Sequence, residues 1–363
     1  MIALLAAVPA GAAPPTFAAG ATVRSGPARQ SIGVAHACIA PDSGNPNVDW
    51  SALHNPIVSY PTAAAKDEAL LWTGGRWHML FSYVTNDPSA PGGVSWNIAT
   101  ATSTDLAHWS GAVPWPRQRG VLGVASPDIT RSPSGRFVVT YQSDPGNTSG
   151  GQDKLYYRTS VDLMHWSSSQ PLAPTLTPGR GDRMIDAALA WTGQGIILGY
   201  KSGTTNGQQA FEIGWSPSGS LAGPWVTVGT PDITVYNDTV ENYEFVTAGG
   251  EWRLIATSNQ LDQPWIFDLA DNPAKPDGWL HWTGGRELSI PAQGWDSGPG
   301  ISSVGFEHAN SAYLCDARAT DGYYYLVYAG SSELTQFGGW GHAMIGIARS
   351  TDLLHWQVPG QAS

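Results

Sequence analysis

The sequence predicts an all-β fold, a five-bladed β-propeller with four antiparallel strands in each blade. The first observation is a phrase that ends in tryptophan and recurs at a nearly constant spacing. Its copies end at Trp109, Trp166, Trp225, Trp282 and Trp356, and the last interval is the longest. A unit of this length that repeats five times is typical of a propeller, whereas a β-sandwich would resemble it only by accident.

The second observation is a glycine-centred turn followed by an aromatic-rich apolar run, upstream of each tryptophan phrase. The copies are TGGRWHMLFS, SPSGRFVVTYQS, TGQGIILGYKS, AGGEWRLIATS and TDGYYYLVYAG. Glycine adopts the positive φ that a tight hairpin needs, and the alternation of bulky and small residues fits a strand. The chain holds 43 glycines and shows almost no helical periodicity, so five blades are expected over about residues 57–359.

Three copies of the tryptophan phrase contain an aspartate at a fixed position before the outer strand. These residues are Asp105, Asp162 and Asp352. An aspartate that recurs at the same tight turn caps the backbone of that turn. We therefore interpret these three residues as structural and not as catalytic.

Composition limits the partners of the chain. Its formal net charge is −11, and only 13% of its residues are charged. A polyanion would be repelled, and no run of Lys or Arg makes a local basic surface, so we expect no nucleic-acid partner. No segment is long and apolar enough to predict a membrane span, so we expect no membrane partner either.

The N-terminus is a short apolar stretch followed by small residues, as in the apolar and cleavage regions of a signal peptide. We expect residues 1–30 to be a signal peptide or a disordered N-terminus, and residues 31–363 to form one propeller domain that is secreted to the extracellular space. The two cysteines, Cys38 and Cys315, suggest one disulfide in an exported protein. The alternative is two unrelated buried thiols.

Each predicted inner strand begins with a polar residue in an otherwise apolar element. Counting back from the glycine turns gives Asp67, Asp128, Asp186, Glu241 and His308. Acids that enter apolar strands are rare and need a reason. Since the inner strands of a propeller line one central channel, five such residues in register predict a single polar site on its axis.

Glycoside hydrolysis is the chemistry that such a site suits. One carboxyl group must remain protonated to donate to the leaving oxygen, and another must be ionised to act as a base or nucleophile. A third carboxylate nearby raises the pKa of the acid by like-charge repulsion. Glutamate suits the donor because its longer side chain reaches over the sugar.

These motifs resemble those of the propeller glycosidases of glycoside hydrolase family 43 and family 62, and more distantly those of the fructan-cleaving families. KDEALLWTGGRWHMLFS resembles the first-blade motif, which implies Asp67 as the general base. IDAALAW resembles the third-blade motif, which implies Asp186 as the pKa modulator. ENYEFVTAGGEWRLIATS resembles the fourth-blade motif, which implies Glu241 as the general acid.

The resemblance extends to two further positions. SPDIT resembles the Ala-Pro-Asp segment of the second blade, which makes Asp128 a substrate-pocket or structural acid. His308 matches a histidine that faces an axial cation in many relatives, often calcium bound through waters. The resemblance therefore implies a structural calcium ion, and we expect no cofactor for the chemistry itself.

Three departures from the family pattern leave alternatives open. Glu68 follows the base where proline is usual, and Asn-Tyr follows Glu241 where Gly-Pro is usual, so Glu244 competes for the acid role. The Asn-Asp-Pro-Asn-Gly motif of the fructan families is absent, which favours an inverting mechanism by analogy.

Several tryptophans fall in predicted loops: Trp215, Trp265, Trp295 and Trp340. Trp295 and Trp340 are the better candidates for platforms that stack on sugar rings, and packing between blades is the alternative. Taken together, these features predict a monomeric hydrolase of arabinose- or xylose-containing plant or microbial polysaccharides and oligosaccharides, of the α-L-arabinofuranosidase type. A non-catalytic sugar-binding propeller and a retaining fructan-type glycosidase are the alternatives.

Overall fold

Antiparallel β-strands are the main secondary structure of the described residues in the computed structural model. The described residues are 48–143, 153–179, 183–203, 209–233, 235, 240–258, 263–296, 303–306, 316–319, 321–333, 335–337 and 341–360. The sheets all belong to one structural unit, residues 36–363. The predicted signal peptide, Cys38 and Cys315 lie outside the described residues. None of the helices in the described ranges is long and apolar enough to cross a membrane.

The strands form five sheets in chain order. The first contains β1 (Ala63–Thr73), β2 (Arg76–Asn86), β3 (Val94–Ser103) and β4 (Val113–Pro114). The second contains β5 (Val124–Arg131), β6 (Phe137–Ser143), β7 (Leu155–Ser160) and β8 (Gln170–Pro171). The third contains β9 (Arg183–Thr192), β10 (Gly195–Gly203), β11 (Gln209–Ser216) and β12 (Val226–Gly229).

The fourth sheet contains β13 (Val240–Ala248), β14 (Glu251–Ser258), β15 (Pro264–Leu269) and β16 (Trp282–Glu287). The last contains β17 (Ser303–Phe306), β18 (Tyr324–Gly330) and β19 (Met344–Ser350). Short 3-10 helices interrupt the connections: η1 (Trp50–Ala52), η2 (Pro91–Gly93), η3 (Pro276–Leu280) and η4 (Gly294–Asp296).

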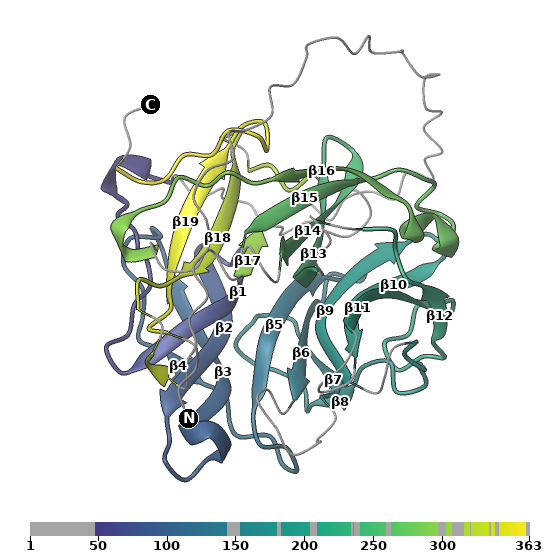
Figure 1. Cartoon of the computed structure of the whole chain (residues 1–363), viewed down its shortest axis with the longest axis horizontal. Helices are drawn as coiled ribbons and strands as arrows, with labels where there is room; N and C mark the ends of the chain where they lie inside the picture. The colour runs from purple at the N-terminus through teal and green to yellow at the C-terminus, as the bar shows by residue number, and fades with distance from the viewer. Residues whose placement is uncertain are drawn as a thin grey trace, which may run out of the picture. The chain divides into compact units, whose positions relative to one another are not determined.

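The first strand of every sheet faces a common centre. Strands β1, β5, β9, β13 and β17 contact one another in cyclic order, and β17 returns to β1. Figure 1 shows the sheets fanned around these strands. Each sheet pairs its strands in chain order. In the first, third and fourth sheets a two-residue connection joins the first two strands, too short for any other pairing. The predicted all-β propeller is confirmed.

The predicted number of complete blades is wrong. Four sheets have four strands, and the last sheet has three in the described part of the chain. The reason lies at the outer edge of β19, where Val58, ahead of β1, takes the pairing position. Val58 donates to the carbonyl of Ile345 at 3.1 Å and accepts from its N–H at 2.9 Å. The prediction took each blade from a single sequence repeat, so it expected the last repeat to supply its own outer strand.

A side chain from the same N-terminal segment strengthens this closure. The Asn55 amide nitrogen donates to the carbonyl of Ile347 at 3.0 Å, and its oxygen accepts from the Ile347 N–H at 2.9 Å. The amide also donates to the Tyr328 hydroxyl at 3.1 Å. The first and last repeats are thereby joined through backbone and side-chain hydrogen bonds.

The core lies between neighbouring sheets, where bulky side chains of one sheet meet small residues of the next. Gly199 on β10 shows how closely the third and fourth sheets approach, because a Cβ there would lie 2.8 Å from the Phe245 ring. Phe245 in turn packs against Trp279 and Trp282. Replacing this glycine would force the two blades apart.

The recurring aspartates of the tryptophan phrase are structural, as predicted. The Oδ1 atoms of Asp105, Asp162 and Asp352 each accept the N–H groups two and three residues later, at 2.8–2.9 Å. The residue after each aspartate is a leucine with positive φ, which a capped turn of this kind requires. These acids serve the turns of the blades.

Candidate active site

Four inner strands carry a β-bulge at the same place. In β1, β5, β9 and β13, two residues face a single residue of the neighbouring strand. The first residue of each bulge has a positive φ: 52° at Asp67, 50° at Ser126, 55° at Asp186 and 51° at Asn242. Such a φ is uncommon outside glycine, so its recurrence shows that each bulge is a maintained feature that redirects a side chain.

The positions of the acids relative to the bulges differ from the predicted register. Asp67 and Asp186 occupy the same position, but Asp128 follows its bulge and pairs with Thr140. Glu241 precedes its bulge and pairs with Thr257. The prediction that four acids share one position is therefore wrong. All four strands carry the same bulge, so the bulge itself does not cause the offset. The connection between β5 and β6 is longer than the two-residue connections of the first, third and fourth sheets, so a count back from the turn misplaces Asp128. The count for Glu241 is wrong by one residue.

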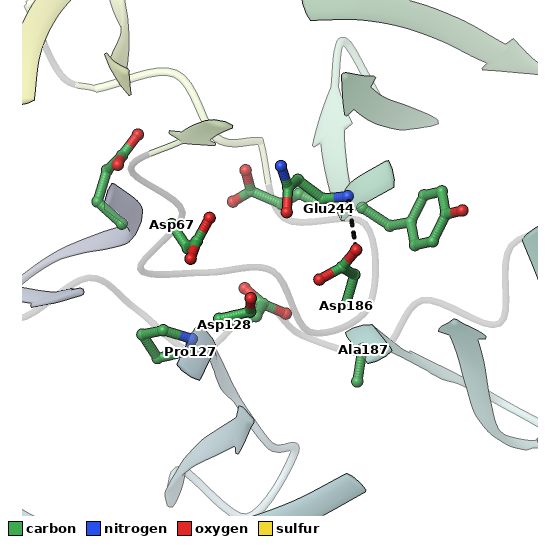
Figure 2. Close-up of a pocket in the computed structure, with 10 residues that line it drawn as sticks. Asp67, Pro127, Asp128, Asp186, Ala187 and Glu244 are labelled. Carbon is green, nitrogen blue, oxygen red and sulfur yellow. Dashed lines mark hydrogen bonds between the residues drawn. The ribbon is translucent and has the colours of Figure 1, made fainter. Parts of the chain in front are cut away.

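A small pocket opens at the bulges. Its lining comes from β1, β5, β9 and β13, and it includes Asp67, Asp128, Asp186 and Glu244. Figure 2 shows these four side chains directed into one space, with Asp67 and Asp186 on opposite sides. Four carboxyl groups from four blades thus meet at one polar site. Asp67, Asp128 and Asp186 are among the five residues that the sequence predicted for such a site, and Glu244 is the fourth.

Asp67 lies beside a buried ammonium group. The Lys66 nitrogen is 3.3 Å from the Asp67 Oδ1 atom, and both side chains are largely buried. Burial acts to lower the pKa of Lys66, but the carboxylates of Asp67, Glu241 and Asp186 outweigh it, so this pKa is raised. Lys66 is therefore held as a cation beside the Asp67 carboxyl group.

Asp186 is a buried carboxyl group whose pKa is raised. It is 6% exposed, and its Oδ2 atom accepts the Asn242 N–H at 3.4 Å, the bond drawn in Figure 2. Burial, followed by repulsion from Glu241, raises the pKa of Asp186 to about 6, and the charge of Lys201 opposes this rise. Near neutral pH the cluster can thus supply and accept a proton.

The two candidates for the general acid have different surroundings. Glu241 forms an ion pair with Lys201, with 2.6 Å between Oε2 and Nζ, and its side chain is 31% exposed. Glu244 follows the bulge, pairs with Ile255 and is 4% exposed. Only Glu244 lines the pocket, while Glu241 lies next to Asp186 and influences its charge.

The other predicted site residues are spread more widely. Asp128 lines the pocket. Trp295 stacks on Tyr328 with ring centroids 5.5 Å apart and packs against the last sheet, the blade-packing alternative. His308 and Trp340 lie outside the described residues, so their predicted roles stay predictions.

Sequence reasoning missed the two lysines of the site. The chain contains only four lysines, and Lys66 and Lys201 both fall in predicted strands of apolar character. A buried lysine needs a partner of opposite charge. The signal in the sequence was the presence of a lysine in an apolar strand. Such a lysine needs an acidic partner, and Lys66 and Lys201 each lie beside one of the predicted acids.

The resemblance implies a calcium ion that faces His308. Within the described ranges, no group of three or more His, Cys, Asp or Glu side chains is arranged to hold a metal ion.

Solved structures with a similar fold are glycoside hydrolases. A glycosyl hydrolase from Bacteroides ovatus superposes with a TM-score of 0.57 at 13% identity, covering 84% of this chain and 88% of that one. An α-L-arabinofuranosidase from Podospora anserina, in complex with cellotriose, gives 0.56 at 16% identity, covering 84% and 96%. A GH62 hydrolase in complex with xylotriose gives 0.57 at 14% identity, covering 82% and 95%.

At these identities the likeness establishes a shared fold. No family model matches the sequence, and no curated protein matches it either. The chemistry must therefore be argued from the pocket.

Proposed function

We propose that the chain is a glycoside hydrolase whose reaction takes place in the pocket at the four bulges. The observation that carries this proposal is the placement of Asp67 and Asp186 at the same bulge position of β1 and β9, in one pocket with different electrostatic surroundings. Asp67 lies beside an ammonium group, whereas the pKa of Asp186 is raised to about 6. A carboxylate and a protonatable carboxyl in one pocket are what glycoside hydrolysis requires.

In this proposal Asp67 is the general base. Its carboxylate accepts a proton from water as the water attacks the anomeric carbon. Glu241 donates a proton to the leaving oxygen, and its partly exposed side chain is accessible to a substrate. Asp186 sits next to Glu241, and two carboxyl groups this close favour holding one proton between them. Asp186 therefore modulates the donor.

The substrate we propose is an arabinose- or xylose-containing polysaccharide or oligosaccharide. The support is the sequence resemblance to families 43 and 62, together with the fold shared with an arabinofuranosidase and with a GH62 hydrolase bound to xylotriose. We further propose that the enzyme is secreted, acts as a monomer and inverts the anomeric configuration. Asp128 and Glu244 would contact the sugar from the pocket wall.

The test is a screen of the purified protein against arabinan, arabinoxylan, levan and aryl glycosides, with proton NMR of the product anomer. We expect release of reducing sugar with inverted configuration, and loss of release in Asp67→Asn. Asp277→Asn, an exposed acid in η3, is the matched control and should keep full activity. Retained configuration on levan would support a fructan-type enzyme, and binding without release would support a sugar-binding propeller.

A further inference from the structure

One strand position supports the backbone of the following blade in the first two sheets. It is the residue paired with the last residue before the bulge, namely Ser82 on β2 and Gln142 on β6 in the first two sheets. The Ser82 hydroxyl accepts the N–H of Ser126 at 2.8 Å. The Gln142 side-chain oxygen accepts the N–H of Asp186 at 2.8 Å. Each of these side chains holds the backbone of the next bulge in place.

Lys201 occupies the same position in the third sheet, where it pairs with Ile185. Its contact differs in kind, because its ammonium group donates to the Glu241 carboxylate at 2.6 Å. Lys201 is 4% exposed. A neutral side chain performs the supporting task in two blades, so the fold alone does not require a charge here.

We propose that Lys201 is a positioning residue of the hydrolase: it fixes the Glu241 carboxyl beside Asp186 and confines the proton-donating form of the site to acidic pH. This inference rests on the proposed function, because it concerns the protonation of the same site. Lys201 acts through Glu241. It lies on β10 and is not one of the residues that line the pocket.

Burial explains why the pair is rigid. A buried ammonium group is stable only with a counter-charge within hydrogen-bonding distance. Glu241 provides that charge and keeps 31% of its side chain exposed. One oxygen of Glu241 is thus held by Lys201, and the other part of the carboxyl group remains available to a substrate.

The charges around this pair decide the direction of the pH effect. Titratable groups from three inner strands surround the pair of Glu241 and Lys201: Asp186 on β9, Lys66 and Asp67 on β1, and Tyr243 and Glu244 on β13. Glu212 on β11 acts in turn on Tyr243. Lys201 lowers the pKa of Asp186, while Glu241 and Asp67 raise it. Removing the ammonium group leaves Lys66 as the remaining cation among these carboxylates. The site would then keep its proton to a higher pH.

The experiment compares the pH profiles of kcat/KM and kcat for wild type, Lys201→Met, Lys201→Arg and the exposed control Lys275→Met. We expect Lys201→Met to move the alkaline limb upward by about 1 pH unit and to lower kcat about tenfold with little change in KM. Lys201→Arg should restore the limb, and Lys275→Met should match wild type. A fall in activity and melting temperature with an unmoved limb would overturn the proposal.

A titration that needs no turnover separates this proposal from the proposed function. Carbon-13 NMR of the carboxyl groups, with Asp186→Asn to assign the signal, should show a higher pKa for Asp186 in Lys201→Met than in wild type. If this shift occurs but no glycoside is cleaved, the proposed hydrolase fails while the electrostatic role of Lys201 stands. If no shift occurs, the Lys201 proposal fails even when hydrolysis is found.

Discussion

Replacing Asp186 with asparagine should stabilise the fold at alkaline pH. The pKa of this carboxyl rises from an ordinary 3.8 to about 6 in the folded chain, first because of burial and then because of Glu241. The folded state therefore holds a proton that the unfolded state has already lost between these values. Stability from this group is complete below about pH 4 and is lost as the pH rises through about 6.

The size of the effect follows from the shift. A rise of about two pKa units corresponds to about 3 kcal/mol of folding free energy. The wild type has this stabilisation while Asp186 is protonated and has lost it above pH 7. Asparagine carries no charge at any pH, and its oxygen can still accept the Asn242 N–H. Asp186→Asn should therefore gain up to about 3 kcal/mol over wild type at pH 8 and almost nothing at pH 4.

Urea unfolding followed by tryptophan fluorescence at pH 4, 6 and 8 measures this difference. Asp232→Asn, at another acid outside the pocket, serves as the control and should follow wild type at every pH. The reasoning is refuted if Asp186→Asn is destabilised equally at all three values, since the carboxylate would then be a net stabilising group. Turnover should be lost in the variant at every pH, so the gain in stability would come at the expense of the proposed reaction.

Other substitutions test the site and the closure. Asp67→Asn should lower kcat/KM by about 10² to 10⁴-fold with an unchanged unfolding midpoint; activity near that of wild type would remove it as the base. Glu241→Gln should lose turnover on aryl glycosides with poor leaving groups and keep more on good ones, and the same pattern in Glu244→Gln instead would transfer the acid role. Gln142→Ala should cost about 1–2 kcal/mol in urea unfolding by freeing a buried N–H, and an unchanged midpoint would show that the bulge needs no support. Val58→Pro removes the donor of the closing hydrogen bond and should lower stability by at least about 1 kcal/mol, whereas an unaffected melting curve would show that the closure contributes nothing.

The repeated elements could be predicted because they are local in the sequence. A glycine turn and a capped aspartate each act within a few residues, so the spacing of Trp109, Trp166 and their counterparts reports them directly. The acids of the pocket were found for the same reason, as polar residues at the start of apolar strands.

Contacts between blades could not be read in this way. The connection between β5 and β6 is longer than its counterparts in the first, third and fourth sheets, and spacing alone does not reveal where each strand ends, so the predicted register of Asp128 and Glu241 was wrong. The ion pair of Lys201 and Glu241 joins strands of different sheets, and no local pattern connects them. Val58 reaches the outer edge of the last sheet from the other end of the chain, which made the count of complete blades wrong.

The hydrogen bonds between Val58 and Ile345 have a consequence for biosynthesis. Val58 leaves the ribosome early, and its partner is translated only when nearly the whole described chain exists. The segment around Val58 must therefore wait without its partner while the intervening sheets fold one after another. Joining residues so distant in sequence makes this contact slow to form. Until then the backbone groups of Val58, and those at the outer edge of β19 once it has been made, are unpaired, and a second nascent chain could occupy either.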